Sequence, residues 1–446
     1  MSGLTQDIAE FVAAPGFARF DAEQTTLLKF GWIDTIGTLL AARDEPVVAI
    51  LRRRASTGEE ARVLFSHWRT APAAALINGT AGHALDYDDV ALGGHPSTVL
   101  VPALLAEAER SGAEGSAVLR AYLVGYEVWA ELYGREPDSF HLKGWHPTAV
   151  LGTIAAAAAV AHLRGLPAAV CVNALGIAAS MASGVVANFG SMTKPLHAGR
   201  AAAAGIEACE LAAAGLTAAG DALEHDGGLL QALSPNGRVD RRLPPRFDSQ
   251  RPRFLDAGLS IKRYPTCYAT HRVIDAVIAL ANQHDLVPEA VAAIDVEIGV
   301  AQARMLRNHA PLTGLEAKFS IEFAVAAALC FRRVGLAQLT DATVAAPQLR
   351  TLMSKVRAST NPTPCPIDPL FALSDRVQIK LAQGTVLDSG AVRFARGNAA
   401  LPLSAAELSD KFLDCAAGVT HPNPGHLLEQ LWELDQINDL RRLGCD

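Results

Sequence analysis

The longest apolar tract of the sequence, Ala149 to Ala161, consists mostly of alanine. Alanine is the strongest helix former, and its small side chain lets neighbouring helices approach closely. The tract is too short to cross a bilayer, because a membrane-spanning helix needs about 20 strongly apolar residues. We therefore expect a helix that is buried on more than one side within a bundle, and no membrane segment.

The same helical spacing of apolar residues recurs through the first part of the chain. It is found at residues 27–42, 99–110, 116–134 and 153–166, all rich in alanine and leucine. Because these segments are apolar on nearly every side, several of them should be buried within one all-helical domain. The prolines and arginines of residues 242–254 then interrupt the helical rhythm and indicate a connection between domains.

A smaller unit with strands follows this connection. Apolar and polar residues alternate around Val296 and around Val377, which predicts two strands, the second leading to a turn at Gly384. The helical run 318–333 lies between them. The predicted fold is therefore mainly α: a large all-helical domain with a smaller α+β lid domain inserted before the C-terminal helices. The predicted boundaries are 1–257 for the first part of the helical domain, 258–396 for the lid and 397–446 for the returning C-terminal helices.

Length, charge and cysteine content narrow the possible classes of protein. The chain has 446 residues, more than one hydrophobic core usually contains, a formal net charge of −7 and 7 cysteines. The negative charge, without a local cluster of lysine and arginine, argues against nucleic acid as a partner. The odd number of cysteines, without a CxxC pair or an N-terminal secretion signal, predicts a reducing, cytoplasmic location.

Two histidines each precede a proline at the entrance of a predicted helix. His95 lies between Gly94 and Pro96, and His146 lies directly before Pro147. Such a loop holds an imidazole in place, and a helix N-terminus favours both carboxylates and a neutral, proton-accepting histidine. For His146 alone, a core histidine bonded to a backbone carbonyl is the alternative. The repeated pattern favours a site for an anionic ligand.

The segment HALDYDDV precedes the first of these loops. On a helix, its residues His83, Asp86 and Asp89 would share one face. This pattern suits either a solvated acidic helix end or a ligand site. Ser97, which follows the His95 loop, is either the N-cap of the next helix or a group that contacts the ligand.

Two lysines lie in segments where an ammonium group has little structural purpose. Lys194 lies among glycine, alanine and methionine, with His197 and Arg200 following as a helix begins, and Lys262 precedes Cys267 near the predicted domain boundary. A single such lysine is usually a surface residue, and such a cysteine a small buried hydrophobe. Two cations beside the histidines would instead form a site for a small polycarboxylate, and a thiol next to a lysine can exchange a proton.

The strings HALDYDDV, GHPS, GWHPT, TKPLHAGRAA and KRYPTC resemble, in order and spacing, those of the MmgE/PrpD family over nearly the whole chain. The family contains 2-methylcitrate dehydratase, cis-aconitate decarboxylase and iminodisuccinate epimerase. The resemblance implies a large helical domain with a smaller α+β lid, a homodimer and no need for a metal; no cofactor motif is visible. By position it assigns catalytic roles to Asp86, His95, His146, Lys194 and Lys262. We add Cys267 to these and expect His83, Ser97, His197 and Arg200 to bind the substrate.

One departure from the family pattern bears on the reaction. Decarboxylase members have a histidine five residues after the second lysine, where this chain has Cys267, with His271 one turn further on. A thiol facing a histidine across one carbon suits epimerisation by two bases. We therefore predict cofactor-independent proton abstraction next to a carboxylate of a small di- or tricarboxylic acid. Epimerisation of an iminodisuccinate-type substrate is placed ahead of 2-methylcitrate-type dehydration, and both are placed ahead of a non-catalytic dicarboxylate-binding protein and a structural helical scaffold.

Overall fold

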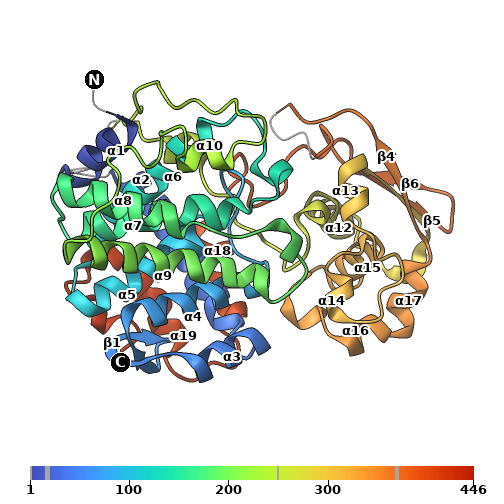
Figure 1. Cartoon of the computed structure of the whole chain (residues 1–446). Coiled ribbons are helices and arrows are strands. Elements are labelled where there is room, and N and C mark those ends of the chain that lie inside the picture. The colour runs from blue at the N-terminus through green and yellow to red at the C-terminus, as the bar shows by residue number, and fades with distance from the viewer. Residues whose placement is uncertain (1–2, 16–20, 249–250, 367–370, 446) are drawn as a thin grey trace. The chain divides into compact units, whose positions relative to one another are not determined.

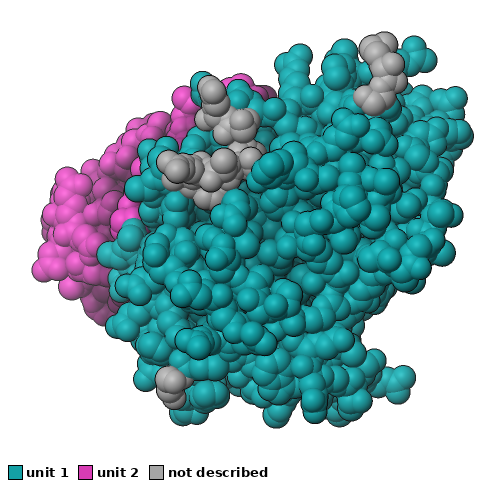
Figure 2. Space-filling model, turned by 90° about the vertical axis from the view of Figure 1, so that its left-hand side faces the viewer, with its two compact units in different colours: residues 1–260, 405–446 teal, residues 261–404 magenta. Residues whose placement is uncertain are grey.

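The computed structural model describes residues 3–15, 21–248, 251–366 and 371–445 (Figure 1). The chain forms two compact units, which Figure 2 shows in different colours. The first unit comprises residues 1–260 and 405–446, and the second comprises residues 261–404.

The first unit is mainly helical, in agreement with the predicted fold class. Short 3₁₀ helices are labelled η. Among the described helices, none combines the length and the apolar character needed to cross a membrane. The helices of the first unit are α1 (Leu4–Ala13), α2 (Ala22–Ala41), α3 (Pro46–Arg54), α4 (Ala71–Ala84), α5 (Ser97–Ser111), α6 (Gly115–Gly134), η1 (Phe140–Lys143), α7 (Pro147–Leu163), α8 (Ala168–Met181), η2 (Val186–Asn188), α9 (Thr193–Ala213), α10 (Leu229–Leu233), α11 (Arg253–Ala257), α18 (Ala405–Cys415), α19 (Pro424–Trp432), η6 (Leu434–Gln436) and η7 (Leu440–Arg442).

The first unit also contains a hairpin, so the prediction that this part is all-helical is wrong in this detail. Strands β1 (Thr57–Val63) and β2 (His67–Arg69) pair antiparallel, with Val63 opposite His67. The turn between them passes through Leu64 and Phe65, both with positive φ. The segment TGEEARV lacks the regular alternation of apolar residues that would have indicated a strand.

Small residues let the central helices of the first unit pack closely. Helix α9 packs against both α4 and α7, and these helices lie together in Figure 1. A Cβ atom added at Gly205 would lie 2.5 Å from the Cβ of Ala156 in α7, and one added at Gly199 would clash with the carbonyl oxygen of Leu76 in α4. Close helix packing of this kind leaves little freedom for shifts. It fixes the end of α4 and the beginnings of α7 and α9 relative to one another.

The second unit combines a sheet with helices. Its sheet has the strand order β4-β3-β5-β6, in which β4 is parallel to β3 and the other two pairs are antiparallel. The predicted strands around Val296 and Val377 are β3 and β5, and Gly384 forms the turn before β6 with φ +94°. The elements of the second unit are η3 (Tyr268–Thr270), α12 (His271–Gln283), η4 (Pro288–Ala290), β3 (Val291–Gly299), α13 (Val300–Met305), α14 (Gly314–Ala317), α15 (Ile321–Phe331), η5 (Leu336–Gln338), α16 (Asp341–Ala345), α17 (Pro347–Met353), β4 (Val356–Asn361), β5 (Arg376–Leu381) and β6 (Val386–Asp388).

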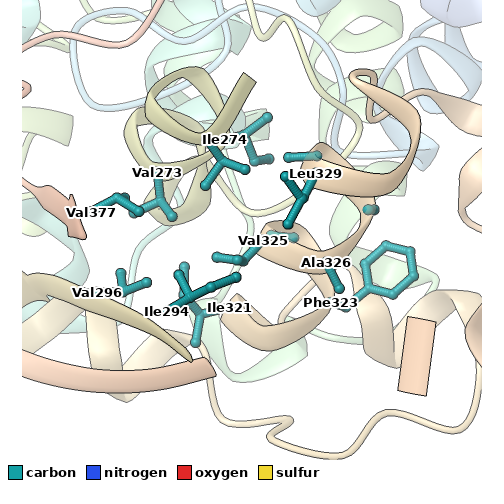
Figure 3. Packing of buried hydrophobic residues seen from close by; sticks show 14 of the residues in the cluster. Val273, Ile274, Ile294, Val296, Ile321, Phe323, Val325, Ala326, Leu329 and Val377 are labelled. Atoms are coloured by element: carbon teal, nitrogen blue, oxygen red, sulfur yellow. The ribbon is translucent and has the colours of Figure 1, made fainter. Parts of the chain in front are cut away.

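The core of the second unit lies between this sheet and helices α12 and α15. Figure 3 shows Ile274 of α12 and Val325 of α15 packed near Ile294 of β3. All three side chains are completely buried. Burial of such an aliphatic side chain contributes about 1.5–3 kcal/mol, so this cluster gives the second unit its own hydrophobic core.

Candidate active site

The ends of four helices bring the polar side chains of the first unit together. His83 lies in the last turn of α4, His95 lies just before α5, and His146 is the N-cap of α7. Lys194 lies in the first turn of α9 and His197 in its second turn. The ring centroids are 4.3 Å apart for His83 and His95, 6.1 Å for His83 and His146, and 5.4 Å for His146 and His197. The N-termini of α5, α7 and α9 add partial positive charge, which favours an anionic ligand.

The aspartates of HALDYDDV do not lie on a helix. Helix α4 ends at Ala84, and Asp86 adopts a left-handed backbone with φ +53°. The expectation that His83, Asp86 and Asp89 share one helix face is therefore wrong. The turn lets Asp86 pair with Lys194 of α9, whereas Asp88 and Asp89 are completely buried.

Asp88, which the sequence did not single out, connects two of the histidines. Nδ1 of His83 lies 2.9 and 3.0 Å from its two carboxylate oxygens, and Nδ1 of His95 lies 3.0 Å from Oδ2. Burial alone would raise the pKa of Asp88, but the charges and hydrogen bonds of the two imidazoles lower it well below its usual range. Asp88 is therefore a buried carboxylate that orients both rings.

His83 supports this arrangement from inside the protein. Its side chain is buried, and burial lowers its pKa to about 4, so the ring is neutral at neutral pH. Its Nε2 is buried without a hydrogen-bond partner among the described residues. His83 therefore holds Asp88 through Nδ1, and its contact with a substrate stays a prediction.

His95 has a fixed tautomer. Its Nδ1 lies 2.8 Å from the backbone carbonyl oxygen of Asp89, in addition to its contact with Asp88. A carbonyl oxygen only accepts hydrogen bonds, so Nδ1 must carry a hydrogen and, in the neutral ring, Nε2 keeps its lone pair. Within the described part of the chain Nε2 makes no hydrogen bond, and it is not among the buried polar atoms. This nitrogen is a positioned proton acceptor.

Among the described residues, His83, Asp88 and His95 form a group whose potential metal-ligand atoms lie within 4.8 Å of one another. This spacing could hold a metal ion. The hydrogen bonds explain the cluster without a metal, because Nδ1 of His95 is directed at a backbone carbonyl and needs its hydrogen there. We therefore assign these side chains as a hydrogen-bonded group.

His146 and His197 form a second pair of imidazoles. Their Nδ1 atoms are 3.1 Å apart, and the ring of Phe189 lies against His146 edge to face at a centroid distance of 4.8 Å. Burial lowers the pKa of both histidines, and the nearby charge of Lys194 lowers them further. Both rings are therefore neutral at neutral pH.

Lys194 is the cation of this group. Its Nζ lies 2.9 Å from Oδ1 of Asp86 and 5.3 Å from the ring centroid of Phe189. The side chains are 20% exposed for Lys194 and 32% for Asp86, so a ligand from solvent can reach the pair. The structure thus brings together four of the predicted catalytic residues: Asp86, His95, His146 and Lys194.

A buried lysine, Lys411, contacts the loop that carries Asp88, and the sequence did not reveal it. Nζ of Lys411 in α18 donates to the carboxylate of Asp34 in α2 and to the backbone oxygen of Tyr87, and lies 4.0 Å from the Tyr87 ring centroid. Burial and the neighbouring carboxylates of Asp34 and Asp88 raise the pKa of Asp89 well above its usual value. These interactions tie α2 and α18 to the loop that carries Asp88.

Two predicted substrate-binding residues lie elsewhere. Ser97 is completely buried, with Oγ 2.7 Å from the hydroxyl of Tyr122, and it follows the N-cap residue Pro96. The side chain of Arg200 is 51% exposed and lines a separate cavity of about 460 Å³ together with Arg54. Neither residue joins the histidine group, because one packs inside the bundle and the other lies on a different face of α9.

Lys262 and Cys267 belong to the second unit. Lys262 is buried, and Cys267 is half-buried at the N-cap of η3, where its backbone N–H donates to the carbonyl oxygen of Lys318 at 2.9 Å. That these two residues join the histidines of the first unit in one site stays a prediction.

Comparison with known proteins identifies the family. The model described as the MmgE/PrpD N-terminal domain matches residues 6–242, and that described as the MmgE/PrpD C-terminal domain matches residues 264–434. The chain belongs to the MmgE/PrpD family. It is accordingly an enzyme of the MmgE/PrpD type, a lyase or an isomerase.

The chain is also similar to proteins named cis-aconitate decarboxylase. The chain is 31% identical to cis-aconitate decarboxylase of Homo sapiens over 350 residues, which covers 76% of this chain and 71% of that protein. It is 30% identical to cis-aconitate decarboxylase of Mus musculus over 386 residues, which covers 83% of this chain and 78% of that protein. A third relative, cis-aconitate decarboxylase of Aspergillus terreus, is 27% identical over 320 residues, which covers 64% of this chain and 63% of that protein.

Proposed function

We propose that this MmgE/PrpD enzyme is a lyase that acts at a carbon next to a carboxylate of a small di- or tricarboxylic acid, with His95 as its base. The observation that carries the proposal is the bond between Nδ1 of His95 and the carbonyl oxygen of Asp89, which leaves Nε2 able to accept a proton. The names of the human and mouse relatives support both a lyase and a tricarboxylic substrate.

In dehydration the chemical step begins with proton transfer. Nε2 of His95 takes the proton from the substrate carbon, and the electron pair of the broken C–H bond spreads into the adjacent carboxylate. In dehydration this pair then forms a double bond to the neighbouring carbon, whose hydroxide leaves as water after receiving a proton. In decarboxylation no proton is removed first: the C–C bond to one carboxylate breaks, carbon dioxide leaves, and the electron pair of that bond forms the same type of carbanion, which then receives a proton through Nε2 of His95. Both lyase reactions therefore need the same stabilised anion.

Cations are needed to stabilise that anion. Lys194 would pair with one substrate carboxylate, and its partly exposed side chain beside the histidines supports this role. Two opposite unit charges about 4 Å apart attract each other with an energy of about 4 kcal/mol at an effective dielectric constant of about 20. We propose Lys262 of the second unit as the second cation.

Epimerisation of an iminodisuccinate-type substrate is the second candidate. Cys267 favours it, because a thiol stands where the family resemblance places the histidine of decarboxylases. A thiol on the opposite face of the carbon from His95 would donate its own proton to that face, which inverts the carbon. The named relatives are lyases, so we rank this reaction behind elimination.

Incubation in deuterated water distinguishes the lyase from the epimerase. The protein is mixed separately with cis-aconitate, 2-methylcitrate and iminodisuccinate, and the products are followed by proton and carbon NMR. Loss of water or carbon dioxide supports the lyase, whereas deuterium uptake with inversion and no loss supports the epimerase. Binding without exchange or turnover of any of the three would contradict the catalytic proposal and favour a dicarboxylate-binding protein.

A further inference from the structure

We propose that His197 is a positioning residue for His146: the two imidazoles share one hydrogen between their Nδ1 atoms and hold protons as a single pair. The inference rests on the proposed function, to which it adds that His146 faces the substrate. It replaces the expectation that His197 binds substrate directly.

The proposal follows from the distance between the two nitrogens. At 3.1 Å, Nδ1 of His146 and Nδ1 of His197 are at hydrogen-bond distance. Without a hydrogen between them two lone pairs would face each other, and with two hydrogens the N–H groups would collide. A single shared hydrogen is the arrangement that fits. In the neutral pair one ring therefore carries its hydrogen on Nδ1 and the other on Nε2.

The surrounding backbone prevents the rings from separating. The backbone N–H of His146 donates to the carbonyl oxygen of Gly184 at 3.0 Å, and Pro147 begins helix α7 directly after it. On the other side, an added Cβ at Gly184 would lie 3.3 Å from Nδ1 of His197, so this ring packs against the same short segment. Phe189 then covers His146 edge to face. Each ring is held where it faces the other.

The neighbouring charges favour a neutral pair at rest. The titratable groups that face His146 are His83 from α4, His95 from the loop before α5, and Lys194 from α9. Two carboxylates lie beside these groups: Asp86 pairs with Lys194, and Asp88 contacts Nδ1 of His83 at 2.9 Å. Burial first, and the positive charges that His83, His95 and Lys194 can carry second, lower the pKa of His146, while burial and Lys194 lower that of His197.

A neutral pair with one shared hydrogen is suited to moving one proton. With the shared hydrogen on His146, its Nε2 has a lone pair and accepts a proton. The shared hydrogen can then move to Nδ1 of His197, which spreads the positive charge over both rings. The reverse movements return the proton through Nε2 of His146. His197 thereby determines whether Nε2 of His146 can accept a proton or donate one to the substrate.

Two substitutions of similar size separate positioning from packing. An asparagine places an amide near the position of Nδ1 and can donate or accept a hydrogen bond, whereas leucine can do neither. We expect His197→Leu to lower kcat at least 10-fold, with KM changed less than about 3-fold, and to shift the pH profile of kcat. His197→Asn keeps a hydrogen bond to His146 but cannot take up a proton, so it should retain more of kcat than His197→Leu while its pH profile still shifts. His162→Leu is the matched control, since His162 bonds only to the backbone oxygen of Val12 among the described residues. A His197→Leu enzyme with the wild-type kcat and pH profile would overturn the proposal.

A measurement without substrate tests the shared hydrogen directly. In protein labelled with ¹⁵N-histidine, NMR should show opposite tautomers for His146 and His197 near neutral pH, and His197→Leu should change the signals of His146. Identical tautomers in the two wild-type rings would refute the pair whatever reaction the enzyme performs. Opposite tautomers in a protein that turns over none of the tested acids would leave the pair intact and reject the proposed function.

Discussion

Lys194 Nζ lies 2.9 Å from Oδ1 of Asp86, a residue 108 positions earlier in the chain. Both side chains are partly exposed, and ion pairs of that kind usually contribute only about 0–1 kcal/mol to stability. The left-handed backbone of Asp86 nevertheless directs its carboxylate towards this lysine. We propose that the pair holds the lysine side chain ready for an anionic ligand and contributes little to the stability of the fold.

Replacing Lys194 with methionine should weaken substrate binding with little change in stability. We expect KM to rise at least 10-fold, because one carboxylate of the substrate loses its cation, while the midpoint of thermal unfolding stays within a few degrees. Lys380→Met makes the same charge change on the exposed face of β5 and serves as the control. An unchanged KM in Lys194→Met would remove this residue from the site.

His83 should make the stability of the fold sensitive to acid. Its pKa falls from 6.5 in the unfolded chain to about 4 in the fold, so between these values the unfolded chain binds a proton that the folded chain does not. Acidification therefore destabilises the fold through this residue. His83→Asn keeps a donor for Asp88 but does not titrate. We expect urea unfolding to show that, between pH 6 and 5, the free energy of unfolding of the wild type falls by up to about 1.4 kcal/mol per pH unit relative to that of the variant. If the difference in free energy of unfolding between wild type and His83→Asn stayed constant with pH, the lowered pKa of His83 would be contradicted.

The buried pair of Lys411 and Asp34 should be critical for stability. Lys411→Met leaves the Asp34 carboxylate buried without its cation, and we expect a loss of about 3–5 kcal/mol in the free energy of unfolding. The double variant Asp34→Asn with Lys411→Met should recover much of this loss. Arg251→Met, which breaks the exposed pair with Asp256, should change stability little. Equal stability losses in the single and double variants would show that the pairing itself is unimportant.

The fold was predictable where the hydrophobic pattern is regular. Strands β3 and β5 alternate apolar and polar residues, and α7 is an unbroken apolar tract, so all three were predicted. Strand β4 and the β1–β2 hairpin were missed. The segment VRASTN of β4 is largely exposed and polar, and its place in the sheet comes from parallel pairing with β3, a long-range contact that local pattern does not encode.

The candidate site was predictable in its outer residues and not in its inner ones. His95, His146 and Lys194 follow from their loops and helix entrances. Asp88 and Lys411 were missed because their roles depend on burial: Asp88 is held by two imidazoles, and Lys411 reaches its partners from a distant helix. The one sequence signal for Asp88 was the presence of three aspartates within four residues beside two histidines.

Solvent exchange at the substrate carbon tests the role of His95 most directly. The measurement follows deuterium uptake from deuterated water by NMR, with whichever of cis-aconitate, 2-methylcitrate and iminodisuccinate the wild type converts. His95→Asn keeps a donor for the Asp89 carbonyl but lacks Nε2, and His426→Asn on the surface of α19 is the control. We predict that His95→Asn slows exchange about 10²–10⁴-fold while its thermal unfolding stays near that of wild type. Exchange at the wild-type rate in His95→Asn would contradict His95 as the base.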